Sequence, residues 1–294
     1  MFRLAYNTNG LAHHRPADSL ALLADLGYEA VALTPDVGGL DLYALDASVV
    51  EDVRRIADER GLELAIETGA RYLMDPRRKH FPTLLEDEAQ ARERRIDFYL
   101  RSIDLAAELG AEVLSLWAGV APGGELGDGA KASPAHEALW YRLTDGLLPV
   151  LDHARERGVR IAFEPEPGMF IERPAGYREL VRRLGDVGPE LGLTLDVGHL
   201  IATGDLPGAR SIGEQLADLE DCLVHVHLDD AQPGVHEHLA FGRGVLDLPA
   251  TLRGLLEIGF SGMAAVELSR DSHRGAAMAA QALAQIRAAL SHIP

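Results

Sequence analysis

The stretch AAELGAEVLSL (residues 106–116) joins the end of a predicted helix to a short apolar strand through Gly110. A glycine at this point can take the left-handed conformation that ends a helix. The strand after it scarcely alternates between apolar and polar residues, which is typical of a strand buried on both faces of a parallel sheet. Junctions of this kind recur along the chain, at residues 23–33, 57–66, 154–163, 188–196 and 256–268.

The segments between the strands show a helical period. In one of them Ile96, Leu100, Ile103 and Ala107 are separated by four, three and four residues, with charged residues between them. The expected strands lie near residues 3–7, 30–34, 62–67, 112–117, 160–164, 192–196, 222–227 and 263–267. The expected helices lie near residues 17–26, 46–60, 88–109, 136–157, 175–184, 208–219, 248–258 and 276–291.

This alternation predicts an α/β fold. Eight strands, each followed by a helix, are the pattern of the (β/α)8 TIM barrel. A doubly wound open sheet shares the alternation, but the count of eight and the final helix favour the barrel. We therefore expect a single TIM-barrel domain over residues 1–294.

The composition argues against several classes of protein. There are 28 Lys and Arg against 46 Asp and Glu, a formal net charge of −18, which argues against a broad cationic surface for nucleic acid. The one cysteine, Cys222, leaves no intramolecular disulfide and no thiolate metal cluster. We find no apolar run of the length of a signal peptide or a membrane span. We expect a cytoplasmic protein without membrane or nucleic-acid partners and, because such barrels often associate, one able to form homo-oligomers.

The last four predicted strands end in residue types that bind metal ions. Glu164 ends RIAFE, Asp196 ends LTLD, His227 lies in CLVHVHL and Glu267 ends MAAVE. The carboxyl ends of barrel strands meet at one mouth, where unpaired carboxylates repel one another and lose hydration. Three carboxylates and one imidazole suit a divalent ion such as Mn²⁺, Mg²⁺, Co²⁺ or Zn²⁺. We therefore predict a metal site formed by these four residues.

Further residues at the same strand ends are candidates for substrate binding. Trp117 could stack on the apolar face of a sugar ring, and a core aromatic is the equal alternative. His199, on a loop after Asp196, could bind substrate or a second metal ion, and Arg243 between two glycines could meet an anionic group. His236 and His238 lie on a predicted loop. His238 is a candidate for substrate binding, and the alternative is that both histidines are simply exposed to solvent. The predicted substrate-binding residues are Glu67, Trp117, His199, His238 and Arg243.

Two alternatives stay open beside the metal site. Glu166 competes with Glu164, which we prefer because it directly continues its strand before Pro165 breaks it. His225 precedes His227 by two residues, so both side chains face into the barrel. His225 is either a hydrogen-bonded neighbour of the site or a core histidine.

These motifs resemble those of the xylose-isomerase-like TIM-barrel superfamily, which holds sugar and sugar-phosphate isomerases and epimerases, inosose dehydratases and apurinic-site endonucleases. The resemblance implies metal binding by the four residues above, an acid/base pair of Glu164 and Glu267, and contact of His199 with substrate. Pro233 stands where the ketose epimerase branch has an arginine. The matching segments are FEPEP (163–167), LDVGH (195–199), HVHLDD (225–230), HEHLAFGRG (236–244) and VEL (266–268).

We therefore expect a divalent-metal-dependent isomerase or epimerase of a sugar, a sugar phosphate or a cyclitol. A proton next to a metal-bound carbonyl would pass to and from Glu164 and Glu267. Loss of a β-hydroxyl from the same enolate would instead make the enzyme a lyase, a dehydratase. The other alternative is a phosphodiester hydrolase that holds further ions with His199, His236 and His238.

Overall fold

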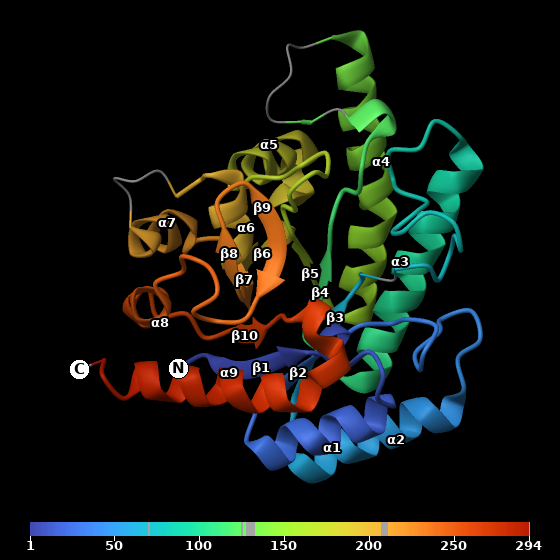
Figure 1. Cartoon of the computed structure of the whole chain (residues 1–294). Helices are drawn as coiled ribbons and strands as arrows, with labels where there is room; N and C mark the ends of the chain where they lie inside the picture. The colour runs from blue at the N-terminus through green and yellow to red at the C-terminus, as the bar shows by residue number, and fades with distance from the viewer. Residues whose placement is uncertain (70, 125, 128–132, 207–210, 294) are drawn as a thin grey trace. The chain divides into compact units, whose positions relative to one another are not determined.

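The computed structural model describes residues 1–69, 71–124, 126–127, 133–206 and 211–293. In these residues the main sheet is a closed barrel of eight parallel strands (Figure 1). Around the barrel the strands follow the order β1-β10-β7-β6-β5-β4-β3-β2. The predicted (β/α)8 TIM barrel is confirmed.

Each barrel strand begins and ends within one residue of its predicted bounds. Every residue of β2, β4, β7 and β10 is buried, as expected for strands covered on both faces. The strands are β1 (Arg3–Asn7), β2 (Ala30–Leu33), β3 (Glu63–Glu67), β4 (Val113–Leu116), β5 (Arg160–Phe163), β6 (Gly192–Asp196), β7 (Leu223–Leu228) and β10 (Met263–Val266).

Helices follow the strands as predicted, with additions after β6 and β7. The helices are α1 (Pro16–Leu26), α2 (Ala47–Arg60), α3 (Ala89–Leu109), α4 (Pro134–Arg157), α5 (Pro174–Leu184), α6 (Val197–Thr203), α7 (Ile212–Leu219), α8 (Leu248–Glu257) and α9 (Gly275–Leu290). The short helix α6 was not predicted, nor was the antiparallel hairpin of β8 (Asp230–Gln232) and β9 (Val235–Leu239). Of the helix predicted over 208–219, residues 208–210 lie outside the described residues.

Short 3₁₀ helices complete the connections. They are η1 (Thr8–Leu11), η2 (Pro122–Gly124), η3 (Gly185–Glu190) and η4 (Ser269–Arg274). Among the described residues, no helix combines the length and the apolar character needed to cross a membrane.

The chain divides into two compact units. The first contains residues 1–33, 51–64 and 194–294, and the second contains residues 34–50 and 65–193. In the first unit β1 pairs with β2 and β10, and β10 pairs with β7. In the second unit β4 pairs with β3 and β5, and β5 pairs with β6. The expectation of one domain over residues 1–294 stays a prediction.

Gly110 shows how the recurring junction works. It ends α3 with a φ of 70°, and its amide hydrogen points to the carbonyls of Ala106 and Ala107. The next residue, Ala111, donates to the carbonyl of Ala106 at 2.8 Å, which closes the helix end. The chain then enters β4 directly.

We expect Gly110→Ala to lower the free energy of unfolding by about 1 kcal/mol, because a side chain disfavours the left-handed conformation. No atom would obstruct the added Cβ, so the backbone conformation alone sets the cost. Urea unfolding followed by circular dichroism measures the change. Glu108→Ala, an exposed position in the same helix, is the control. Equal stability of the two variants would contradict the expectation.

Candidate active site

Three of the four predicted metal ligands lie together in the first unit, at the carboxyl ends of β6, β7 and β10. Asp196 ends β6, His227 is the last residue but one of β7, and Glu267 directly follows β10. His227 Nδ1 lies 2.9 Å from Glu267 Oε2 and 3.9 Å from Asp196 Oδ2. All three side chains are buried. Acidic and imidazole groups buried at such distances form a set that suits a divalent ion.

The parallel pairing of β7 and β10 sets the height of these side chains. His227 pairs with Ala265, and the amide of Glu267 donates to the carbonyl of Leu228 at 3.1 Å. Side chains two residues apart face the same side of a strand, so Glu267 stands one layer above Ala265. His225 lies one layer below His227, fully buried, with the two ring centroids 5.0 Å apart.

Asp196 begins helix α6 as well as ending β6. Its Oδ1 accepts the amide hydrogen of His199 at 2.9 Å. Its Oδ2 accepts no hydrogen bond from the described residues, while ring nitrogens of His199 and His238 lie 3.6 Å away. Burial and then the Asp229 carboxylate raise the pKa of Asp196 well above its ordinary value. A buried carboxylate oxygen without a donor is one that a cation would satisfy, so these residues fit a metal ion.

The neighbours of Glu267 favour its charged form. Burial alone would raise its pKa, but His238 and then His227 outweigh burial and hold the pKa of Glu267 well below its ordinary value. His238 Nε2 lies 3.7 Å from Glu267 Oε1. The charged carboxylate is the form that binds a metal ion or accepts a proton.

Asp229 belongs to the site, although the sequence analysis assigned it no role. Its Oδ2 lies 2.7 Å from His238 Nδ1, and its Oδ1 accepts no hydrogen bond from the described residues. Burial raises the pKa of Asp229. Gly198 leaves the necessary space, because a Cβ there would lie 2.1 Å from Asp229 Oδ1. The segment HLDD (227–230) places two aspartates just after the predicted ligand His227. The sequence alone does not tell which of the two faces the site.

Three histidines form a cluster beside Asp196. One nitrogen of each of His199, His236 and His238 lies within 4.8 Å of the others, and His236 Nε2 is 3.0 Å from His199 Nε2. Two expected positions are corrected. His199 lies in α6 rather than on a loop, because Asp196 caps that helix. His236 and His238 lie on β9 rather than on a loop, because the β8–β9 hairpin folds against α6.

Asp230 organises the glycine-containing loop that follows the hairpin. Its carboxylate accepts the backbone amide hydrogens of Gly242, Gly244 and Leu246, each at 2.8 Å. These three amide hydrogens are therefore committed to Asp230 and do not face a substrate. Arg243 is exposed, and its own part in substrate binding stays a prediction.

In the second unit, three residues end neighbouring strands in the same manner. Glu67 is the last residue of β3, Trp117 follows β4 and Glu164 follows β5, and all three are buried. Glu166 is only partly buried, which favours Glu164 over it. The roles of Glu164 in metal binding and of Glu67 in substrate binding stay predictions.

Trp117 is buried among side chains of the second unit. Its ring lies 4.9 Å from the buried guanidinium of Arg95, and its carbonyl accepts the hydroxyl hydrogen of Tyr99 at 3.0 Å. These contacts are those of a core aromatic. The indole also packs nearly perpendicular to the ring of His80, on the loop after β3, with ring centroids 5.2 Å apart. Stacking of Trp117 on a substrate stays a prediction.

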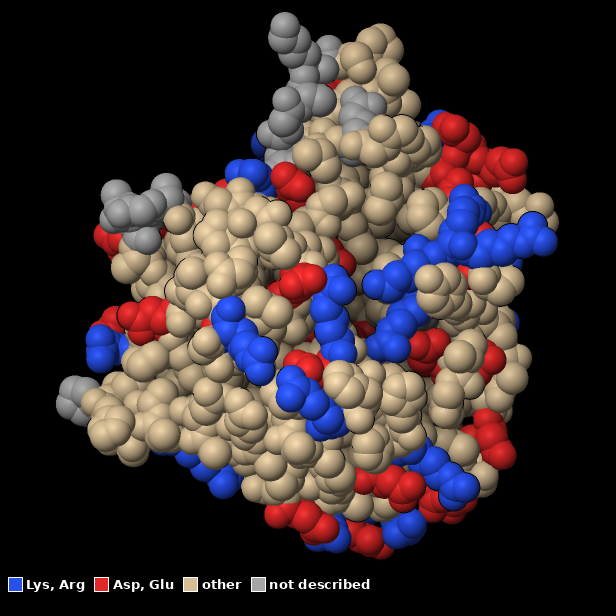
Figure 2. Space-filling view, in the orientation of Figure 1, with Lys and Arg blue, Asp and Glu red and all other residues tan. Residues whose placement is uncertain are grey.

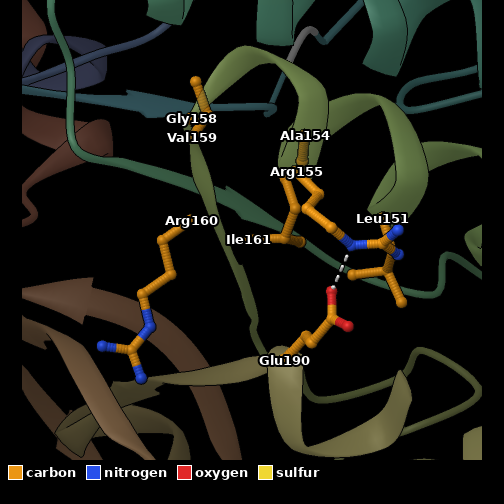
Figure 3. A pocket seen from close by; sticks show the side chains of 8 residues that line it. All are labelled: Leu151, Ala154, Arg155, Gly158, Val159, Arg160, Ile161 and Glu190. Atoms are coloured by element: carbon orange, nitrogen blue, oxygen red, sulfur yellow. Dashed lines mark hydrogen bonds and ion pairs between the residues drawn. The ribbon is translucent and has the colours of Figure 1, made fainter. Parts of the chain in front are cut away.

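The second unit also has a groove of about 290 Å³ at the opposite, amino end of β5 (Figure 3). Its charged residues Arg155 and Glu190 already pair, with Arg155 Nε 3.2 Å from Glu190 Oε2, while Arg160 points away from both. Barrel enzymes place their chemistry at the carboxyl ends of the strands. We therefore take the cluster of Asp196, His227 and Glu267, rather than this groove, as the candidate site.

The family model described as "Xylose isomerase-like TIM barrel" matches residues 20–290. The chain belongs to this family. The resemblance inferred from the motifs is thereby confirmed. An L-ribulose-5-phosphate 3-epimerase of Salmonella paratyphi A is 25% identical over 280 residues, which cover 93% of this chain and 89% of that protein.

Solved structures share the fold of this xylose isomerase-like barrel. The D-allulose 3-epimerase from Methylomonas sp. superposes with a TM-score of 0.73 at 14% identity and covers 98% of each chain. The 3-keto-D-glucoside 4-epimerase of E. coli has a TM-score of 0.73 at 15% identity and covers 98% of this chain and 100% of that one. At these identities the likeness concerns the fold alone.

We expect Gly198→Ala to lower stability by roughly 1–3 kcal/mol, because the new methyl group collides with the buried Asp229 carboxylate. Thermal unfolding measures the change. Gly213→Ala in α7 is the matched control, since its Cβ would find its nearest neighbour at 3.9 Å. An unfolding midpoint of Gly198→Ala equal to that of the control would contradict the close approach of α6 to Asp229.

Proposed function

We propose that the chain is a divalent-metal-dependent epimerase or isomerase of a sugar or sugar phosphate. The relatives named above are sugar epimerases, and they support the coarser prediction of an enzyme of the sugar isomerase and epimerase type. The observation that carries the finer proposal is the unsatisfied Oδ2 of buried Asp196, beside His227 and Glu267.

We assign the ion to Asp196, His227, Glu267 and Glu164. Glu164 is included because β5 and β6 are neighbours in the barrel, and Phe163 pairs with Leu193. Glu164 thus follows its strand at the edge where β6 ends. A divalent ion bound there would polarise a substrate carbonyl and make the adjacent C–H more acidic.

Two carboxylates of this chain would then handle the proton. In the strand order β6 and β7 lie between β5 and β10, so Glu164 and Glu267 follow strands that are not neighbours. One carboxylate removes the proton from the carbon, and the other returns a proton to its opposite face. Inversion at one carbon, an epimerisation, is the result.

A phosphorylated substrate is compatible with the charges near the site. Figure 2 shows both basic and acidic side chains on one face of the molecule, although the formal net charge of the chain is −18. Arg270 is exposed on η4, three residues after Glu267, and its Nη2 donates to the carbonyl of His236 at 3.1 Å. Arg243 lies on the loop after the hairpin that carries His236. Both are candidates to meet a phosphate.

The three-histidine cluster favours one second candidate, a hydrolase that uses several metal ions. His199, His236 and His238 offer one nitrogen each within a span that a single ion could bridge. Metal stoichiometry separates the two candidates, because the epimerase needs one ion and the hydrolase needs two or three.

We expect about one divalent ion per chain in protein purified without chelator, measured by elemental analysis. Asp196→Asn keeps the helix cap but removes the charge, and His227→Gln removes the imidazole, so both should lose the ion. His153→Ala, a surface histidine paired with Asp104, should keep it. Two or three ions per chain would favour the hydrolase. Absence of any ion after reconstitution would contradict both candidates.

We expect Glu267→Gln to reduce turnover by about 10²- to 10⁴-fold, because the amide cannot accept the proton. Exchange of substrate hydrogen with deuterated water, followed by NMR over a panel of free and phosphorylated ketoses, measures the step. Glu257→Gln changes an exposed carboxylate on α8 and should leave the rate unchanged. Wild-type exchange rates in Glu267→Gln with metal bound would remove Glu267 from the mechanism.

A further inference from the structure

The two oxygens of the Glu267 carboxylate have different partners. Asn9 donates a hydrogen bond from Nδ2 to Oε1 at 2.7 Å. The other oxygen, Oε2, faces His227 Nδ1 at 2.9 Å. A carboxylate held at both oxygens cannot turn about its last torsion angle, which is otherwise soft. Asn9 thus acts on the orientation of the residue that the proposed function places on the ion and on the proton.

The turn after β1 positions the side chain of Asn9. Asn9 lies in η1, and its amide hydrogen is accepted by the side chain of Asn7 at 3.1 Å. This local hydrogen bond fixes the backbone from which the Asn9 side chain projects. The turn follows β1 directly, and β1 pairs with β10, the strand that Glu267 follows.

Two glycines bring the turn close to the segment after Glu267. η1 packs against η4, the 3₁₀ helix that begins two residues after Glu267. A Cβ at Gly275, where η4 ends, would lie 2.2 Å from the carbonyl oxygen of Gly10. A Cβ at Gly10 would lie 2.6 Å from the hydroxyl oxygen of Tyr6. Larger residues at either position would therefore collide with these atoms, so the two glycines permit the observed packing of η1.

We propose that Asn9 is a positioning residue that ties Oε1 of Glu267 and thereby turns Oε2 towards His227, the side from which both residues would meet the ion. This inference rests on the proposed function. An amide suits the task because its Nδ2 only donates, and a carboxylate only accepts. Asp in place of Asn9 would set a second acidic side chain against Oε1 and repel it. Leu would fill a similar volume without donating.

The test compares Asn9→Asp and Asn9→Leu with the wild type by calorimetric titration of metal-stripped protein with Mn²⁺. We expect both variants to bind one ion with an affinity about 10- to 100-fold lower, as is usual when the partner of a metal ligand is removed. In the deuterium-exchange assay we expect kcat to fall while KM changes little, because Asn9 orients the reacting carboxylate. Asn9→Asp has the same number of heavy atoms as the wild type. If Asn9→Leu does not fold, the Mn²⁺ affinity and kcat of Asn9→Asp decide the test.

His273→Ala is the matched control, because this exposed residue lies on η4 without a described contact to Glu267. It should bind Mn²⁺ and turn over substrate as the wild type does. A purely structural role for Asn9 would lower the thermal midpoint but leave Mn²⁺ affinity and kcat unchanged, and that result would overturn the proposal while the proposed function stands. A wild type that binds no Mn²⁺ would overturn both.

Discussion

The burial of the Asp196 carboxylate is the constraint on which the site depends. One oxygen is committed to the amide of His199, so the side chain cannot turn towards solvent. The other oxygen has no donor among the described residues, although His199, His238 and His227 each place a ring nitrogen within 3.9 Å of it. Such burial is costly for a charged group unless positive charge meets it. The residues around Asp196 therefore fit the divalent ion that we propose.

Asp196 also explains why an extra helix stands at this position. A strand ending in Asp, with the side chain turned back to the third following amide, starts a helix at once. Helix α6 has only seven residues, and its first turn carries Gly198 and His199 to the site. Gly198 lets the helix approach Asp229, and His199 faces His236 from the hairpin. By starting α6, Asp196 thus places the helix against the Asp229 carboxylate and brings His199 to the site.

The barrel could be predicted closely because its signals are local. Apolar runs and capping glycines such as Gly110 fixed each strand to within one residue, and the strand ends then indicated Asp196, His227 and Glu267. Helix α6 was missed because its seven residues, VGHLIAT (197–203), make fewer than two full turns directly after a strand. The β8–β9 hairpin was missed because β9 reads VHEHL (235–239), without the alternation of apolar and polar residues that marks a strand. Their positions follow from contacts between residues far apart in the sequence, such as His236 with His199. The same holds for Asn9, whose partner Glu267 is 258 residues away.

Neighbouring aspartates after β7 divide two tasks. Asp229 lies against His238 in the site, whereas Asp230 accepts three backbone amide hydrogens from residues 242–246. Successive side chains of an extended chain point in opposite directions. Asp229 can therefore face the site while Asp230 binds the loop beside it. These loop amides already donate their hydrogens to Asp230. We therefore assign the proposed phosphate contact to arginine side chains such as Arg243 and Arg270 rather than to the amides of Gly242, Gly244 and Leu246.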